Sequence, residues 1–388
     1  MISKIRSLAE MSLLYSSMLS VRSKRIYVFG AWQGKKFSDD SKYLFLQAIQ
    51  DKSIKAVWIT KSQYVYDYMK QKGFPVCLHN SAKGIYYQLR AGYYFTSERK
   101  SDVSSLLIGN ATRINLWHGV GLQKILHDVG PKRATAPKSK RKTFLKKVSK
   151  YPYRKEYVLS TSDTMTKIFS SAFNKPVEQI WQLGQPRNDV FFNNQLETEK
   201  LPFIKEGRRM ILYMPTHRQH GKIPFRVADI LDLAALNKFC EENNMLFVVK
   251  KHFYHRAEQE KLDSYSNLLD ISTTEYDSQL LLKHASILIT DYSSCYVDYL
   301  LLNKPVIFYN FDYENYVLND RDLYFDYNDT TPGPKVTDFP SLLNSLEKSV
   351  SEEHCYESDR EKVKNIFYSK DNQTTVGQKI LAKVKNEA

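Results

Sequence analysis

The stretch Ser286–Tyr309 (SILITDYSSCYVDYLLLNKPVIFY) decides the fold class of this 388-residue chain. It starts with an apolar, β-branched run, continues through a polar turn and a helix-like segment, and closes with a second apolar run, PVIFY. Apolar runs without polar alternation are typical of parallel strands that are covered on both faces. The stretch therefore reads as strand, turn, helix and strand, and it predicts an α/β fold built on a parallel sheet.

Similar runs recur along the whole chain. In the first half they are Arg25–Ala31, Ala56–Thr60, Ala91–Thr96, Arg113–Trp117, Tyr157–Ser160 and Ile180–Leu183, and in the second half Met210–Met214, Leu246–Lys250, Leu268–Ile271, Ser286–Thr290 and Pro305–Tyr309. Two such series in tandem predict two doubly wound, Rossmann-type domains facing a central cleft. Strand and helix signals lapse between Asn194 and Arg208, so we expect domains of residues 1–195 and 196–388.

Composition excludes several protein classes. Apolar residues make up 42% of the chain, which is enough for sizeable cores and argues against disorder. The four cysteines lie far apart without metal-ligand spacing, so neither a zinc site nor a disulfide framework is expected. No apolar run reaches the roughly 18 residues that span a bilayer, and the N-terminus lacks the pattern of a secretory signal. Any membrane contact is therefore expected to be peripheral.

Positive charge is concentrated in one segment. The formal net charge is +15, and Pro131–Lys155, which we call the basic segment, carries eleven Lys and Arg residues and no acid. Such a field attracts anionic lipid, nucleic acid or a polyphosphate polymer, although a solvated loop remains an alternative. The first 25 residues show helical apolar spacing with flanking cations. They predict an amphipathic helix that either lies on a membrane or covers the first sheet.

In the first half, chemistry-bearing residues follow two of the predicted strands. His118 lies in Asn115–Gly121 (NLWHGVG), where a Gly-x-Gly sequence lets backbone approach a ligand. Because histidine titrates near neutrality, His118 suits the deprotonation of an attacking hydroxyl, while a structural role stays open. The second motif, Gly184–Asp189 (GQPRND), brings a turn, a cation and polar groups near the domain junction.

In the second half, three strand ends carry polar groups. Thr216 and Arg218 leave one strand together, and Lys250 and His252 leave the next. Ser293 and Ser294 stand where a helix N-cap belongs, so hydroxyls and free N–H groups there suit a diphosphate, although a plain capped helix remains an alternative. Neither a P-loop nor a dinucleotide-binding glycine motif occurs, which disfavours those enzyme classes.

Taken in order, these motifs resemble the CDP-glycerol glycerophosphotransferase family of teichoic acid and capsule synthesis. The resemblance covers roughly Arg25 to Pro334 and rests on W-H-G (Trp117–Gly119), G-x-P-R-N-D (Gly184–Asp189), P-T-x-R (Pro215–Arg218), K-x-H (Lys250–His252) and D-Y-S-S (Asp291–Ser294). It implies a GT-B fold of two domains, peripheral membrane attachment, and nucleotide binding mainly in the C-terminal half.

The resemblance also implies roles for single residues. His118 matches the family's proposed base on the acceptor hydroxyl, and His252 its second essential histidine, near the donor phosphates. The implied donor-binding residues are Thr216, Arg218, Lys250, Asp291, Ser293 and Ser294, and the implied cleft residues are Gly119, Arg187, Asn188 and Asp189. Two positions depart from the family pattern: Phe253 stands where proline is common, and Val120–Ile125 (VGLQKI) replaces the usual Thr-Pro-Leu-Lys.

The expected reaction is transfer of a polyol phosphate from CDP-glycerol or CDP-ribitol to a hydroxyl of a lipid-linked teichoic acid or capsular polymer, with release of CMP. We expect no cofactor, no catalytic metal and no nucleic-acid partner, and we place the chain at the cytoplasmic face of the bacterial membrane. The membrane-binding residues would be Lys138, Lys140, Arg141, Lys142, Lys146 and Lys147. The alternatives are a GT-B glycosyltransferase that uses a nucleotide sugar and a nucleic-acid-binding protein.

Overall fold

The computed structural model describes residues 2–129, 155–218, 226–251, 262, 264–319, 322–351 and 355–387. The chain forms two compact units. Unit 1 comprises Met1–His118, His127–Asp189 and Asp371–Ala388, and unit 2 comprises Gly119–Leu126 and Val190–Lys370.

Unit 1 is built on a parallel sheet with the strand order β3-β2-β1-β4-β5-β6-β7. Its strands are β1 (Ser23–Gly30), β2 (Lys55–Thr60), β3 (Val76–Leu78), β4 (Ala91–Thr96), β5 (Thr112–Asn115), β6 (Lys155–Ser160) and β7 (Ile180–Gln182). Its α-helices are α1 (Ile2–Met18), α2 (Asp39–Ala48), α3 (Gln63–Gln71), α4 (Ala82–Arg90), α6 (Asp163–Phe173) and α14 (Val376–Asn386).

The apolar runs become the buried centre of this sheet. Phe29 on β1 and Phe95 on β4 are fully buried and their rings stack with centroids 4.6 Å apart. After β1 the chain builds β2 and β3 on one side and then crosses to β4 on the other side. The strand order therefore reverses between β1 and β4, and the crevice at the carboxyl ends of these strands is where doubly wound sheets bind ligands.

Unit 2 repeats this plan with the parallel strand order β10-β9-β8-β11-β12-β13. Its strands are β8 (Arg209–Tyr213), β9 (Met245–Val249), β10 (Leu268–Asp270), β11 (Ala285–Thr290), β12 (Val306–Tyr309) and β13 (Lys335–Val336). Its α-helices are α7 (Leu233–Glu242), α8 (Ser278–His284), α9 (Cys295–Tyr299), α10 (Tyr313–Asn319), α11 (Tyr327–Thr330), α12 (Phe339–Ser351) and α13 (Glu357–Phe367).

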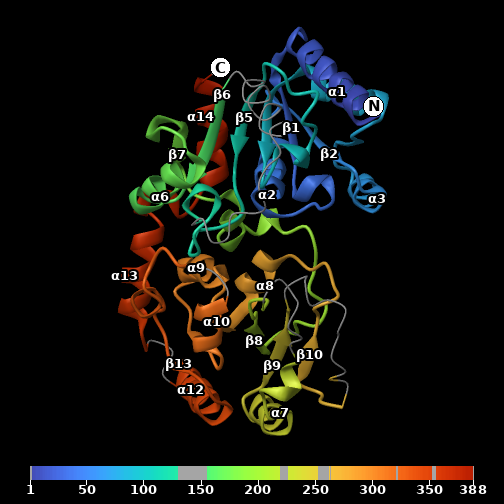
Figure 1. Ribbon diagram of the computed structural model, residues 1–388. Coiled ribbons are helices and arrows are strands. Elements are labelled where there is room, and N and C mark those ends of the chain that lie inside the picture. Colours follow the sequence, from blue (N-terminus) through green and yellow to red (C-terminus); the bar gives the residue numbers. More distant parts are fainter. Residues whose placement is uncertain are drawn as a thin grey trace. The chain divides into compact units, whose positions relative to one another are not determined.

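The strand order of unit 2 reverses between β8 and β11. Ile211, Phe247 and Ile289, from three neighbouring strands, are buried in one cluster that α7 and α12 cover (Figure 1). The segments that follow β8 and β11 therefore leave the sheet side by side at its carboxyl edge. The predicted α/β class with two doubly wound parallel sheets is confirmed, while their facing a central cleft stays a prediction.

The division into units differs from the predicted boundary at residue 195. The chain changes units between Asp189 and Val190, and two short segments, Gly119–Leu126 and Asp371–Ala388, belong to the unit that the sequence did not assign them to. The second of these segments contains α14, which returns to unit 1 (Figure 1). Asp189 fixes this return, because its carboxylate accepts hydrogen bonds from the N–H groups of Val376 (2.9 Å) and Gly377 (2.8 Å).

Helix α1 combines a docked face with exposed apolar side chains. Leu14 and Ser17 are buried, and the Ser17 hydroxyl accepts a hydrogen bond from the Gly109 N–H at 2.9 Å. Leu13 is nevertheless 45% exposed and Leu19, just beyond the helix, is 87% exposed. Of the helices in the described part of the chain, none is both long and apolar enough to cross a membrane.

Candidate active site

His118 lies at the carboxyl edge of the unit 1 sheet, three residues after β5. The preceding residue, Trp117, has φ +61°, a left-handed conformation that costs a non-glycine residue of order 1–3 kcal/mol. Two contacts hold it there. Its N–H donates to the Asn115 side-chain oxygen (3.2 Å), and its ring packs against Phe173 with centroids 4.9 Å apart. The surrounding structure thus imposes the backbone conformation that presents His118.

The surroundings of His118 also indicate which ring nitrogen carries the hydrogen. Nδ1 lies 3.2 Å from the carbonyl oxygen of Ser97, which follows β4. Since a carbonyl oxygen can only accept, Nδ1 carries the hydrogen and Nε2 carries the lone pair. Burial lowers the pKa of His118 below its usual value, against the opposing effect of the Asp39 carboxylate. A neutral imidazole with an unprotonated Nε2 can accept a proton from a hydroxyl.

Arg187 secures the loop that carries His118. Its guanidinium donates to the His118 carbonyl oxygen (2.8 Å) and forms an ion pair with Asp39 (3.2 Å), and its backbone N–H donates to Asp40 (3.1 Å). Trp32, which follows β1, donates its indole N–H to Asp39 and lies with its ring centroid 5.6 Å from the His118 ring. Arg187 therefore joins the start of α2 to the loop that follows β5.

The structure also shows where the other predicted residues of the first half lie. Asn188 and Asp189 are buried within unit 1, and both Asp189 oxygens are used at the start of α14, one of them also by Gln47 (2.9 Å). Gly119 has φ +149°, in the region that favours glycine, and it is the first residue of the segment that joins unit 2.

In unit 2, Asp291 organises the ends of β8 and β11. Its carboxylate is fully buried and accepts hydrogen bonds from the backbone N–H and the hydroxyl of Thr216, at 2.9 and 2.6 Å. It also pairs with Arg218 at 2.9 Å. A carboxylate so enclosed does not face a ligand. Its geometry indicates that it positions the two loops instead.

Arg218 is likewise engaged by the protein. Its guanidinium donates to both carboxylate oxygens of Asp312, at 2.5 and 2.9 Å, in addition to its bond with Asp291. It also lies over the rings of Tyr292 and Tyr316, with its central carbon 5.1 and 5.5 Å from their centroids. The sequence predicted a supporting charge for donor phosphates, whereas the structure shows a buried cation that links two aspartates and two tyrosines.

The predicted serine pair lies beside this network. Ser293 and Ser294 precede α9, and both are partly exposed. The Ser294 side chain makes no capping hydrogen bond, while the Ser293 hydroxyl accepts from the Cys295 N–H at 3.4 Å. Because α9 has only five residues, its dipole adds little, and the hydroxyls are what this turn offers to an anion.

Lys250 directly follows β9, and its ammonium group donates to the Thr274 carbonyl oxygen at 3.3 Å. His252 lies outside the described residues, as do all six predicted membrane-binding residues of the basic segment. In the part of the chain that the structure describes, no cluster of three or more His, Cys, Asp or Glu residues is arranged to hold a metal ion.

Several site residues escaped the sequence analysis. Trp32 and Ser97 directly follow predicted strands, so inspection of every strand end would have found them. Asp312 and Tyr316 lie a few residues beyond another strand end, in a stretch that also follows the family pattern, but no role was predicted for them. Nothing in their local sequence indicates that they meet Arg218, because that contact depends on the order of strands in the sheet.

Comparison with known proteins identifies the family. The family model described as CDP-glycerol:poly(glycerophosphate) glycerophosphotransferase matches residues 12–385. A teichoic acid poly(glycerol phosphate) polymerase of Bacillus spizizenii is 29% identical over 348 residues, which cover 84% of each chain. A teichoic acid glycerol-phosphate transferase of Staphylococcus aureus is 26% identical over 94% of each chain.

Two further matches extend this comparison. The teichoic acid ribitol-phosphate polymerase TarL of Staphylococcus aureus is 32% identical over 60% of this chain and 41% of its own length. A solved structure of the wall teichoic acid polymerase TagF superimposes with a TM-score of 0.79 and 23% identity, covering all of this chain and 96% of the other, which shows a shared GT-B-like fold. Since the family model spans nearly the whole chain, this protein is a transferase that belongs to the CDP-glycerol:poly(glycerophosphate) glycerophosphotransferase family.

Proposed function

We propose that this protein transfers a polyol phosphate from a CDP-polyol, either CDP-glycerol or CDP-ribitol, to a hydroxyl of a lipid-linked teichoic acid acceptor. The acceptor oxygen attacks the β-phosphorus, which bears the polyol, and a new phosphodiester bond forms. The bond from that phosphorus to the bridging oxygen breaks, and CMP leaves with this oxygen. The hydroxyl proton passes to a base, so atoms and charges balance.

His118 is the proposed base. The observation that carries the proposal is the contact of Nδ1 with the Ser97 carbonyl oxygen, which leaves Nε2 as the acceptor, in a chain that matches the family over residues 12–385. Burial, which lowers the pKa of His118, favours the neutral imidazole that this role needs. Nε2 then receives the proton as the O–P bond forms, and Arg187 keeps the loop in place through the His118 carbonyl oxygen. General base catalysis of this kind contributes typically 10²–10⁴-fold in rate.

Unit 2 is the proposed donor-binding unit. We assign the pyrophosphate to the hydroxyls of Ser293 and Ser294 at the reversal of strand order, where doubly wound sheets bind nucleotides. Lys250 leaves the neighbouring strand and is assigned as a supporting cation, and His252 is assigned to the same phosphates. Asp291 and Arg218 are assigned an indirect role: they fix the loops that present these groups to the donor.

The acceptor is proposed to be membrane-bound, and the protein to attach peripherally at the cytoplasmic face. The exposed apolar side chains of Leu13 and Leu19, at the end of a docked helix, support this assignment. The sequence of the basic segment contains eleven Lys and Arg residues, and each cation that approaches an anionic lipid surface contributes about 1 kcal/mol.

A transfer assay with a panel of CDP-polyols tests the proposed function. The full-length protein is incubated with a lipid-linked acceptor and CDP-glycerol, CDP-ribitol or UDP-sugars, and nucleotide release and product length are measured. CMP release from one CDP-polyol, together with an acceptor longer by one or more polyol phosphates, is the expected result. Release of UDP with a new glycosidic bond would instead establish the glycosyltransferase alternative, which the family membership disfavours.

A further inference from the structure

The segment that directly follows His118 is held by unit 2 through its backbone. We call Gly119–Leu126 the strap. The Lys124 N–H donates to the Asp322 carbonyl oxygen (2.8 Å), and the Tyr324 N–H donates to the Leu122 carbonyl oxygen (2.8 Å). These two bonds form an antiparallel bridge between Gln123 of the strap and Leu323. A single peptide bond therefore separates the proposed base from a segment that belongs to the donor-binding unit.

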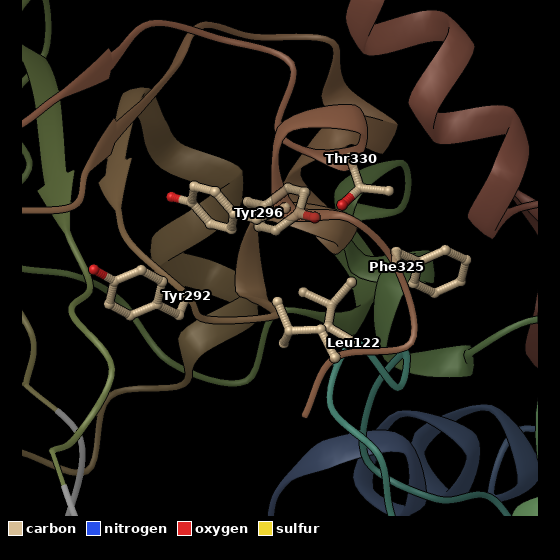
Figure 2. Close-up of a pocket in the computed structure, with 7 residues that line it drawn as sticks. Leu122, Tyr292, Tyr296, Phe325 and Thr330 are labelled. Carbon is tan, nitrogen blue, oxygen red and sulfur yellow. The ribbon is translucent and has the colours of Figure 1, made fainter. Parts of the chain in front are cut away.

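An apolar side chain of the strap is buried in the same unit. Leu122 is 9% exposed and lines a small pocket with Tyr292, Tyr296 and Phe325. Figure 2 shows the leucine beside these aromatic rings, with Tyr292 on the opposite side of the pocket from Phe325. The lining is almost wholly apolar, so it anchors the strap by packing. Because apolar packing is not directional, the orientation of the strap depends on its hydrogen bonds.

One side chain of the strap contacts a tyrosine that packs beside the proposed donor site. The Gln123 amide donates to the Tyr316 hydroxyl at 2.5 Å. The Tyr316 ring stacks on Tyr292, with centroids 3.8 Å apart and an interplanar angle of 15°. Tyr292 immediately precedes Ser293 and donates its hydroxyl to Asp312 at 3.0 Å. A continuous series of contacts thus runs from the turn assigned to the pyrophosphate to the strap.

We propose that Gln123 is a positioning residue that couples occupancy of the donor site to the placement of His118. The inference rests on the proposed function of Ser293 and His118. A donor that orders the Ser293 turn also restricts the motion of the Tyr292 and Tyr316 rings. The hydrogen bond from the Gln123 amide to Tyr316 then restricts the motion of the strap. Misplacement of a base by about 1 Å lowers the rate about 10²-fold, so fixing the strap affects turnover without any contact between Gln123 and substrate.

The strap is also where the sequence departs from the family pattern, with Val-Gly-Leu-Gln in place of Thr-Pro-Leu-Lys. A neutral amide both donates and accepts, so it can bond a tyrosine hydroxyl without adding charge to a largely apolar surrounding. The family resemblance therefore assigns no role to Gln123, and the contact with Tyr316 is the observation that does.

A double-mutant cycle tests the coupling kinetically. Gln123→Leu removes the donor group, Tyr316→Phe removes the acceptor but keeps the ring stack, and the double variant removes both. We expect kcat to fall about tenfold in each single variant and no further in the double variant. The KM for CDP-glycerol and the calorimetric Kd for CMP should stay within about twofold. Gln71→Leu and Tyr64→Phe, both on the exposed surface of α3, are matched controls that should behave like the wild type.

Hydrogen exchange tests the same coupling without any turnover. Saturating CMP should slow amide exchange across Trp117–Leu126 in the wild type, and the Gln123→Leu variant should lose this protection. Unchanged kcat in all three variants, or equal protection by CMP with and without Gln123, would overturn the inference. A kcat loss that follows the fall in melting temperature would overturn it too. A wild type that releases no CMP from any CDP-polyol would refute the proposed function, while the exchange data would still decide the coupling.

Discussion

Replacing Arg218 by lysine separates a positioning role from a direct phosphate contact. The guanidinium is 5% exposed, makes two bonds to Asp312 and one to Asp291, and donates a further bond to the Thr216 carbonyl oxygen at 2.6 Å. A lysine keeps the charge but cannot reproduce this fork, so two or three charge-assisted bonds are lost at about 1.5 kcal/mol each. We therefore expect a loss of about 3–4.5 kcal/mol in the free energy of unfolding, which is comparable to the 3–5 kcal/mol lost when one partner of a buried ion pair is removed completely.

Thermal and urea unfolding measure this loss. For a unit of this size, each kcal/mol lowers the melting temperature by about 2–4 °C, so the Arg218→Lys variant should melt roughly 6–18 °C lower. Arg25→Lys, at an exposed position, is the matched control and should not change stability. If Arg218 instead serves mainly as a phosphate contact, the variant will keep its wild-type stability and bind CMP much more weakly. That result would refute the structural account of this residue.

Four further predictions address the other groups. His118→Gln should lower turnover about 10²-fold or more while leaving calorimetric CMP affinity unchanged, and the acid limb of the wild-type kcat/KM profile should lie below about pH 6.5 because burial lowers the pKa of His118. Near-normal turnover of that variant would make the histidine structural. Alanine at both Ser293 and Ser294 should weaken CMP binding in a folded protein, and unchanged affinity would move the donor site elsewhere. Burial raises the pKa of Glu156, but Arg113 and Lys175 together lower it from 4.5 to about 2, so this carboxylate contributes up to about 3 kcal/mol above pH 4.5 that is lost as pH falls towards 2. Glu156→Gln should flatten that part of the stability profile, and an unaltered profile would contradict the ion pairing. Neutralising the six predicted lipid-binding cations of the basic segment should abolish co-sedimentation with anionic vesicles at physiological salt, and undiminished binding would exclude this segment as the anchor.

Much of the fold was predictable because buried parallel strands consist of nearly continuous apolar runs, which are visible in the sequence. All eleven predicted strands are present, and their ends differ from the predicted ones by at most two residues. Two strands, β3 and β13, were not predicted. They have only three and two residues and lie at sheet edges, and such short runs give little hydrophobic signal. The return of α14 to unit 1 escaped as well, since it depends on the long-range capping by Asp189.

The positions of the candidate residues at strand ends were predictable, whereas the contacts that these residues make were not. Strand ends pointed to His118, Arg218 and Ser293, and the structure places each at the carboxyl edge of its sheet. The sequence could not show that Arg218 forms ion pairs with Asp291 and Asp312, because pairing between loops depends on the order of strands in the sheet. A charged residue after a strand indicates a polar edge, and only the fold decides whether its partner is a ligand or the protein.

In the proposed reaction, one phosphorus atom of the donor moves with the polyol. Phosphorus-31 NMR of a reaction with CDP-glycerol and a lipid-linked acceptor tests it most directly, because the two phosphorus atoms of the donor have different fates. We expect the pyrophosphate signals to be replaced by one phosphomonoester signal from CMP and, in equal amount, one phosphodiester signal in the acceptor. Formation of CDP, with both phosphorus atoms still in a diphosphate and none in the acceptor, would contradict it.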